Sequence, residues 1–226
     1  LLGVRRGAGP LPSFWFGAYR EACVLDERLR SWTVLDATSK RTPCVAPPLP
    51  AAGPFRLQFK DYDLDAEGHK QRVLKAQAAI ADGHYYQVNL TARGRFRFSG
   101  SPAGLFEALL QRQPVPYGAL LQTGAGTVVS ASPELLLRTK GDQAWSRPMK
   151  GTLPAGPGAA AKLARSEKDR AENLMIADLV RNDLGQVCSE VRVPRLFCVE
   201  RYATVCQMVS EVRGQLAPER DRWDAL

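Results

Sequence analysis

One lysine stands in a segment whose neighbours could make it reactive, the stretch "SRPMKGTLP" at residues 146–154. Lysine side chains are mostly exposed, so the simplest interpretation of Lys150 is a surface ammonium group. Arg147 precedes it closely, and the pair Gly151 and Thr152 follows, which predicts a tight backbone turn beside a second cation. A desolvated lysine next to another cation has a lowered pKa and becomes nucleophilic. Lys150 is therefore a candidate nucleophile.

A carboxylate that could assist this lysine is Glu134, in the stretch "SASPELLL", where it follows Pro133 at the predicted end of a strand. Taken alone, Glu134 reads as an exposed carboxylate at the rim of a sheet. A carboxylic acid and a lysine on adjacent strands of one sheet, however, make a general acid and a nucleophile, which suits substitution of a poor leaving group.

The segment "SEKDRAENLMIADLVRNDLG" predicts a helix over residues 166–184, with Ser166 as the N-cap and Gly185 as the stop signal. Apolar residues cover much of its circumference, so we expect its middle and end to be buried on most sides. These residues are Leu174, Met175, Ala177, Val180 and Leu184.

Three acids of this helix, Asp169, Glu172 and Asp183, fall within about 60° of one another at about 100° per residue. A carboxylate in such a place needs a cation. One alternative is an ion pair between Lys168 and Glu172, four residues apart. The other is a set of oxygen ligands for Mg²⁺, which is usually bound by few carboxylates and keeps waters or substrate oxygens in its shell.

The elements that must position these side chains alternate between helix and strand. Residues 63–84 predict a helix with Gly83 as its stop, residues 85–98 a strand, and residues 101–113 a helix with a Ser-Pro start. Residues 117–149 show three short strand patterns that look like consecutive antiparallel strands, and residues 187–216 read as further strand. The fold class expected is α+β with mostly antiparallel sheet.

The first 60 residues form a separate N-terminal part in this interpretation. Residues 13–36 read as paired strands with an alternating apolar face, and "RTPCVAPPLPAAGP" at 41–54 reads as a loop or linker. Because the composition shifts near residue 60, we expect an N-terminal sheet portion with a linker at 1–60 and a second domain at 61–226.

Composition narrows the class of partner. The chain of 226 residues has 31 lysines and arginines against 23 acids, a formal net charge of +8, which raises nucleic acid, membrane or an anionic substrate as partners. The cations are scattered and no aromatic residues interleave with them, which disfavours nucleic acid. No apolar run has the length of a membrane span and no signal peptide pattern opens the chain. Five cysteines without a C-x-x-C pair disfavour a zinc site and fit a cytoplasmic protein.

Five segments resemble, in the same order, the motif blocks of the chorismate-utilising enzymes. They are "GHYYQVNLTARGRF", "SASPELLL", "RPMKGTLP", "SEKDRAENLMIADLVRNDLGQVC" and "VPRLFCVERYATVCQMVSEVRGQL". The resemblance covers residues 70–226. It implies two mostly antiparallel β-sheets that form a sandwich flanked by helices, and an enzyme that acts on chorismate with Mg²⁺.

Two positions separate the branches of this family. The residue matching Lys150 is typically alanine in the anthranilate and isochorismate branches, whereas P-x-K-G-T is typical of the branch that makes aminodeoxychorismate. Isochorismate-type enzymes carry a lysine that activates water at the position of Gln87, so an amide there suits ammonia instead. Two alternatives stay open: an anthranilate-type synthase with an atypical lysine, and a non-catalytic fragment that docks an amidotransferase.

The resemblance also implies a role for each residue. Glu134 would protonate the departing hydroxyl at C4 of chorismate while Lys150 attacks C2. Ammonia from a separate glutamine amidotransferase subunit would then add at C4, which gives 4-amino-4-deoxychorismate on the way to 4-aminobenzoate and folate. Metal ligands would be Glu172 and Asp169, and the substrate would contact Thr152, Gly151 and Gln87.

Some features depart from the family pattern. Gln207, in "TVCQMVS", stands where many members have histidine, so a role for that histidine cannot be carried over. The family continues past "RGQL" with further blocks, including one that completes the Mg²⁺ site. The resemblance therefore implies a C-terminally truncated chain, which we expect not to turn over chorismate alone at a useful rate.

Overall fold

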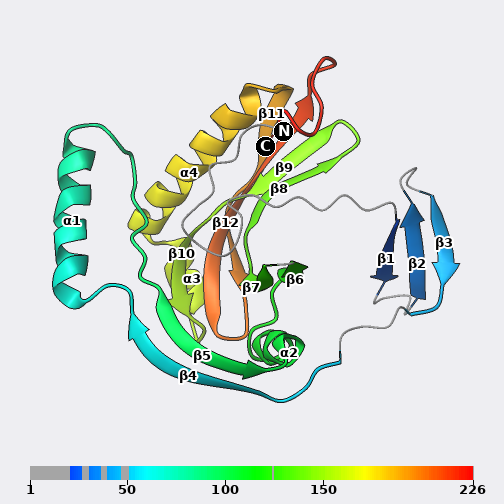
Figure 1. Ribbon diagram of the computed structural model, residues 1–226. Helices are drawn as coiled ribbons and strands as arrows, with labels where there is room; N and C mark the ends of the chain where they lie inside the picture. The colour runs from blue at the N-terminus through cyan, green and yellow to red at the C-terminus, as the bar shows by residue number, and fades with distance from the viewer. Residues whose placement is uncertain (1–20, 27–30, 37–39, 47–50, 124, 226) are drawn as a thin grey trace. The chain divides into compact units, whose positions relative to one another are not determined.

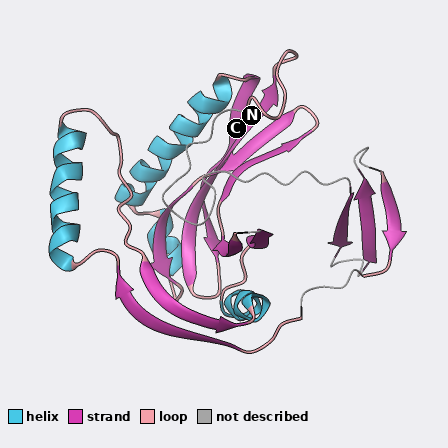
Figure 2. Cartoon of the chain, in the orientation of Figure 1, coloured by secondary structure: helices cyan, strands magenta, loops and turns pink. Residues whose placement is uncertain are grey.

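The computed structural model describes residues 21–26, 31–36, 40–46, 51–123 and 125–225. By its internal contacts the chain divides into two compact units, one of Leu1–Pro50 with Phe106–Leu226 and one of Ala51–Leu105. The boundary expected near residue 60 falls inside a strand of the second unit. The described elements are helices and antiparallel strands, as the α+β expectation requires (Figure 2).

The larger unit contains a five-stranded antiparallel sheet (Figure 1). Its strands are β8 (Leu135–Lys140), β9 (Gln143–Arg147), β10 (Met149–Pro154), β11 (Cys188–Arg201) and β12 (Val205–Leu216). One edge of β12 pairs with β11, and its other edge pairs with β10 at residues 205–209 and with β9 at residues 212–215. Consequently β9 and β10 behave as one strand that is interrupted at Pro148.

Two helices, α3 (Ala159–Ala164) and α4 (Glu167–Gly185), pack on this sheet. Leu163 of α3 lies in a buried cluster with Met208, and Ala177 of α4 lies in another with Val212. Because Met208 and Val212 are four positions apart in β12, their side chains point to the same face of the sheet. Both helices therefore cover one face of the sheet.

The start of α4 agrees with the sequence, because the side chain of Ser166 accepts a hydrogen bond at its N-terminus. The expectation of burial on most sides was wrong. Only Asn173, Ala177 and Leu184 of α4 are buried, and Leu174 is 50% exposed. The three buried residues are four and seven positions apart, so α4 faces the sheet along one narrow stripe.

The strands before this sheet are antiparallel, as expected. β6 (Tyr117–Thr123) and β7 (Gly126–Ser132) form one antiparallel pair, and β8 and β9 form another. Residues 117–149 thus hold four strands and not the three expected, because the connection at Pro133 and Glu134 divides the middle one. The Ser-Pro start of a helix is confirmed too, since α2 spans Pro102–Arg112 and Ser101 Oγ accepts a hydrogen bond from the Gly104 amide at 3.2 Å.

The second unit holds α1 (Ala66–Ala81) and an antiparallel pair of β4 (Phe55–Tyr62) and β5 (Gly94–Gly100). The predicted helix is confirmed, but the predicted strand at 85–98 was wrong over its first nine residues. The last pair of the ladder joins Tyr62 to Gly94. The residues before Gly94 lie beyond the end of β4, so they have no strand to pair with in this ladder. An alternating pattern of side chains does not form a strand unless a neighbouring strand supplies backbone hydrogen bonds.

The N-terminal strands β1 (Glu21–Asp26), β2 (Ser31–Asp36) and β3 (Arg41–Cys44) form a three-stranded antiparallel sheet. The expected pair of strands is confirmed for the described residues, and residues 13–20 and 27–30 of that prediction lie outside them. The loop predicted from residue 41 was wrong at its start, because β3 occupies it. Pro43 is tolerated there since β3 is at the edge of the sheet.

Candidate functional site

The break between β9 and β10 brings Glu134 beside the segment that carries Lys150. The carbonyl of Pro148 accepts a hydrogen bond from the Ser210 amide of β12 at 3.0 Å. The Met149 N–H belongs to the same trans peptide group and so points away from β12. It donates to Oε1 of Glu134 at 3.0 Å. Glu134 lies in the connection between β7 and β8 and contacts the backbone of β10 one residue before Lys150.

The two-residue connection between β7 and β8 holds this carboxylate. Glu134 donates its backbone N–H to Ser132 Oγ at 3.2 Å, and Ser132 Oγ donates to the Glu134 carbonyl at 3.2 Å. Pro133 fixes its own φ between them. Since Leu135 then pairs with Arg147, the side chain of Glu134 has little freedom to leave the break in the neighbouring strand.

Lys150 lies in a β-bulge rather than in the tight turn that the sequence predicted. Met149 pairs with Val209 and Thr152 with Gln207, so Lys150 and Gly151 together oppose the single residue Met208. Such a bulge bends the strand and re-aims side chains, and bulges are common next to active sites. Lys150 itself is half-buried.

Gly151 allows β10 to approach α4 closely. Its φ is +89°, in the region that favours glycine, and a Cβ there would lie 2.8 Å from Cβ of Asp169. Any other residue would meet both backbone strain and a clash. Gly151 therefore sets how near the carboxylate of Asp169 lies to the bulge of Lys150.

The two predicted metal ligands occupy one turn of α4. Asp169 lies against Gly151, and Glu172 follows three residues later on the same side of the helix. Asp183 shares their stripe but is 14 residues beyond Asp169, about 21 Å along the axis, so it cannot join the same ion. The structure brings Asp169 and Glu172 together and leaves Asp183 apart.

Glu172 is not buried as expected. Its side chain is 36% exposed, and Oε1 lies 3.8 Å from Nζ of Lys168, so the ion pair considered from the sequence is present. Such an exposed pair contributes about 0.3–0.5 kcal/mol. A divalent cation can compete with an interaction of that size.

The donor chemistry of Asp169 and Glu172 fits Mg²⁺, a hard cation that one or two carboxylates can hold together with waters or substrate oxygens. Within the described ranges, no group of three or more histidine, cysteine, aspartate or glutamate side chains forms a closed metal site. The pair fits a shared site, in which a substrate supplies further oxygens.

Arg147 is engaged by a cluster that the sequence did not reveal. Its guanidinium donates to Glu200 Oε1 and to the hydroxyl of Tyr117 at 3.4 Å, and its Nε lies 3.8 Å from Glu211 Oε2. Burial lowers the pKa of Arg147, but Tyr117 and Glu200 outweigh it, so the pKa lies above its usual value. Paired with two carboxylates, Arg147 cannot be the uncompensated cation expected beside Lys150.

Tyr202 completes this cluster by donating its hydroxyl to Glu200 Oε2 at 3.0 Å. Burial and the carboxylate of Glu200 raise the pKa of Tyr202 to about 12. Glu200 lies 53 residues from Arg147 in the chain. The only sequence signal for this pairing is that Glu200 is a charged residue within an apolar strand pattern.

The remaining predicted residues are placed differently. Thr152 is exposed and pairs with Gln207, so their side chains share the face of the sheet opposite to Met208 and the helices. Oε1 of Gln207 is buried and has no hydrogen-bond partner within the described part of the chain. Gln87 lies exposed in the irregular segment before β5, in the second unit.

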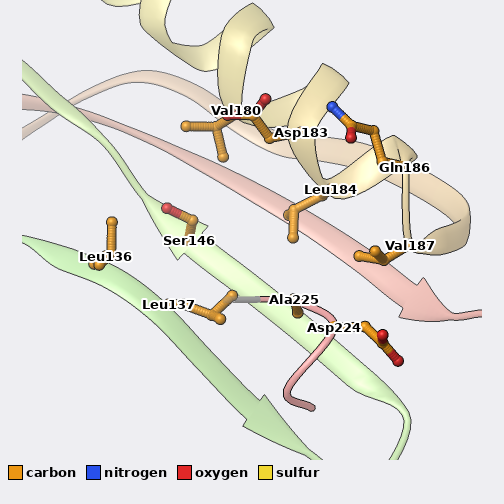
Figure 3. Close-up of a pocket in the computed structure, with 10 residues that line it drawn as sticks. All are labelled: Leu136, Leu137, Ser146, Val180, Asp183, Leu184, Gln186, Val187, Asp224 and Ala225. Carbon is orange, nitrogen blue, oxygen red and sulfur yellow. The ribbon is translucent and has the colours of Figure 1, made fainter. Parts of the chain in front are cut away.

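A pocket of about 360 Å³ lies at the other end of α4 from Asp169 (Figure 3). Figure 3 shows Val180 and Leu184 of α4 on one side of it and Leu137 of β8 on the other. Of the residues with predicted chemistry, only Asp183 lines it, the acid that lies apart from Asp169 and Glu172. Convergent polar groups, and not hollow space alone, mark a reactive site, so the candidate site is the bulge of β10 with Glu134 and the first turns of α4.

Comparison with protein families gives one match over nearly the whole chain. A family model described as chorismate binding enzyme matches residues 4–226. This confirms the resemblance carried by the five sequence blocks.

Curated relatives divide between two activities. The chain is 41% identical to an aminodeoxychorismate synthase of Streptomyces pristinaespiralis, over 97% of this chain and 34% of that protein. It is 33% identical to aminodeoxychorismate synthase component 1 of Salmonella typhimurium, over 96% of this chain and 50% of that protein. It is 40% identical to anthranilate synthase component 1 of Streptomyces coelicolor, over 79% of this chain and 37% of that protein. The chain thus spans half the length of these relatives or less.

A solved structure supports the fold. Anthranilate synthase component I of Streptococcus pneumoniae superposes with a TM-score of 0.66 at 24% identity, over 87% of this chain and 51% of that one. The expected fold of antiparallel sheets with flanking helices is confirmed. Separately, within the described part of the chain no helix combines the length and apolar character that crossing a bilayer requires.

Proposed function

The chain belongs to the family of chorismate binding enzymes, and we propose that it carries the nucleophile and the general acid of an aminodeoxychorismate synthase. The reaction converts chorismate and ammonia to 4-amino-4-deoxychorismate and water, in the route to 4-aminobenzoate and folate. The names of two curated relatives support this choice of activity.

One observation carries the proposal: Glu134 is hydrogen-bonded to the amide that directly precedes Lys150. In the first step the neutral amine of Lys150 attacks C2 of chorismate, and both ring double bonds shift, from C1=C2 to C1=C6 and from C5=C6 to C4=C5. The C4–O bond breaks, and the hydroxyl leaves as water with a proton from Glu134. A lysine that forms a covalent intermediate divides a difficult substitution into two easier ones.

The second step reverses the first with ammonia as the incoming group. Ammonia adds at C4, both double bonds shift back to C5=C6 and C1=C2, and the C2–N bond breaks, which releases Lys150 as an amine. The proton lost by the new amino group returns to the carboxylate of Glu134, so both residues regain their starting state. Chorismate and ammonia are consumed and only aminodeoxychorismate and water are formed.

Asp169 and Glu172 would hold Mg²⁺, which when bound neutralises and fixes a carboxylate of the substrate. Gly151 supports this arrangement because it lets Asp169 lie against the bulge that carries Lys150. Substrate contacts from Thr152, Gly151 and Gln87 belong to the same proposal.

A second polypeptide supplies the ammonia in this proposal, a glutamine amidotransferase. The name "component 1" of one relative supports it. We place the reaction in the cytoplasm, which agrees with five free cysteines at positions 23, 44, 188, 198 and 206. The excess of positive charge also suits an anionic substrate such as chorismate.

Binding can be tested by thermal unfolding of the purified chain. A ligand that binds only the native state raises the melting temperature by mass action. Chorismate with Mg²⁺ should raise it more than either alone, because the substrate completes the shell of the metal. If neither changes the melting temperature, the chain is a non-catalytic fragment and the proposal fails.

A second candidate is an anthranilate-type synthase, which the 40% identity to the Streptomyces coelicolor relative favours. The two activities differ in whether Lys150 becomes covalently attached to the substrate. Anthranilate formed from chorismate and ammonia without a lysine adduct would establish this second candidate.

A further inference from the structure

Two β-bulges face each other across β12. On one side, Lys150 and Gly151 of β10 together oppose Met208. On the other, Arg195 pairs with Glu211 and Cys198 with Val209, so Leu196 and Phe197 of β11 together oppose Ser210. The residues of β12 that face the two bulges are therefore only two positions apart, on the side that α4 covers.

One side chain of α4, Asn173, contacts both of these β12 residues. Its Nδ2 donates to the Met208 carbonyl at 3.1 Å, and its Oδ1 accepts a hydrogen bond from Ser210 Oγ. Asn173 and Ser210 are fully buried. The amide of Asn173 thus ties α4 to β12 at the positions of the two bulges, and its oxygen and nitrogen both have partners.

The second bulge is held in an unusual conformation by the same group of residues. Among the described residues, Phe197 is the one non-glycine residue with positive φ, at 56°. Its N–H donates to Ser210 Oγ at 3.2 Å, and the guanidinium of Arg170 stacks 4.4 Å from the centre of its ring. A bulky side chain in this conformation is unfavourable, and such outliers persist where surrounding contacts hold them, often at functional sites.

Arg170 and Asn173 interleave with the two carboxylates along α4, at positions 170 and 173 against 169 and 172. Apolar packing of α4 is concentrated elsewhere, at Ala177 and Leu184 towards its C-terminal end. Contacts to the two bulges therefore fix the N-terminal part of the helix, which carries the carboxylates.

We propose that Asn173 is a positioning residue that, with Ser210 and Phe197, sets Asp169 and Glu172 at the distance from Lys150 that Mg²⁺ and substrate require. This inference rests on the proposed function, since it assigns a task to the carboxylates that the reaction uses. If the network is broken, the apolar end of α4 stays packed while the carboxylates shift relative to the bulge of β10.

Ser210→Ala tests this without a change of charge. It removes the acceptor of the Phe197 amide and the donor to Asn173, and it should weaken the binding of Mg²⁺ alone, measured by calorimetry, by about tenfold. The matched control is Ser146→Ala, in which a buried serine of β9 loses a hydrogen bond to the Leu135 carbonyl. Both variants should melt at a lower temperature, but Ser146→Ala should bind Mg²⁺ as the unaltered chain does.

Arg170→Lys serves as a second variant if Ser210→Ala does not fold, because Arg170 is exposed and the substitution keeps its charge. It weakens the contact to the ring of Phe197 and should lower the Mg²⁺ affinity to a smaller extent. Equal Mg²⁺ affinities in Ser210→Ala and Ser146→Ala would overturn the inference and leave the proposed function standing. If Ser210→Ala is unfolded, an unchanged Mg²⁺ affinity in Arg170→Lys would have the same consequence. Absence of Mg²⁺ binding in the unaltered chain would overturn both the inference and the metal part of that function.

Discussion

The amide of Met149 donates a hydrogen bond of 3.0 Å to the carboxylate of Glu134, and Lys150 is the next residue along β10. This contact exists because Pro148 interrupts the strand formed by β9 and β10, which leaves an edge amide free to bind a side chain. The hydrogen bond occupies Oε1 of Glu134 and directs the carboxyl group to the bulge. The carboxylate of Glu134 is thereby held beside the backbone that carries Lys150.

Replacing Glu134 by glutamine should stop the chemistry without unfolding the chain. The amide oxygen of glutamine can still accept from the Met149 amide, so the melting temperature should change little. A glutamine cannot give a proton to the leaving hydroxyl, and removal of a general acid slows such a step about 10²–10⁴-fold. The rate of attachment of chorismate to Lys150, followed by mass spectrometry, should fall accordingly. An unchanged rate would remove Glu134 from the mechanism.

Gly151→Ala should destabilise the chain by about 1–3 kcal/mol, because it adds backbone strain and a clash with Asp169. Gly141→Ala is the matched control. Gly141 also has positive φ, at +60°, but a Cβ there would have no atom within 4 Å, so only the strain of about 1 kcal/mol applies. Denaturant unfolding measures both values. Equal losses would show that β10 and α4 are not in tight contact.

Lys168→Gln should strengthen Mg²⁺ binding about twofold. The ammonium of Lys168 lies 3.8 Å from Glu172 and competes with a metal ion for the carboxylate. An exposed pair of this kind is worth about 0.5 kcal/mol, which sets the size of the effect. Calorimetric titration with Mg²⁺ measures it.

The control for this change is Lys162→Gln on α3, which alters the net charge equally. It should leave the Mg²⁺ affinity almost unchanged. If both substitutions strengthen binding to the same degree, the effect comes from net charge, and Glu172 is not shown to be a ligand.

The stability of the chain should fall as the pH rises from about 10 to about 12. The pKa of Tyr202 is about 12 in the folded chain, above its ordinary value of 10, so over this range the unfolded state binds fewer protons than the folded state. Stability therefore decreases with increasing pH there, and the contribution of Tyr202 is complete only below pH 10. Melting temperatures across this range measure the slope.

Tyr202→Phe should flatten this part of the pH profile, since phenylalanine does not titrate. Tyr86→Phe is the control, because Tyr86 is 78% exposed. It should keep the slope of the unaltered chain. If the two variants have the same profile, burial and the carboxylate of Glu200 do not raise the pKa of Tyr202.

The order of the helices and strands could largely be predicted from the sequence, because each depends on local signals. Asp65 and Ser166 cap α1 and α4, and Ser101 opens α2. What failed depends on partners that are distant in the chain. The strand expected before Gly94 lacks a neighbour because β4 ends at Tyr62.

The candidate site shows the same division. Residue types and spacing nominated Lys150, Glu134 and the acids of α4 as candidates, and the structure places Asp169 beside the bulge of Lys150. Periodicity cannot show which acid is exposed, and Glu172 proved to be half-exposed and paired. Nor could it show the pairing of Arg147 with Glu200 or the contacts of Asn173 to β12, which join residues 53 and 37 positions apart.

The central claim is that Lys150 is the nucleophile, and the mass of the intact chain after incubation with chorismate and Mg²⁺ tests it most directly. The account predicts a covalent adduct on the chain, located at Lys150 by peptide mapping. Lys150→Ala should abolish the adduct, whereas Lys162→Gln should retain it. Addition of ammonia should release the adduct, because the amine displaces the lysine. An adduct that survives Lys150→Ala, or a chain that forms none, would contradict the account and return Lys150 to the surface cations.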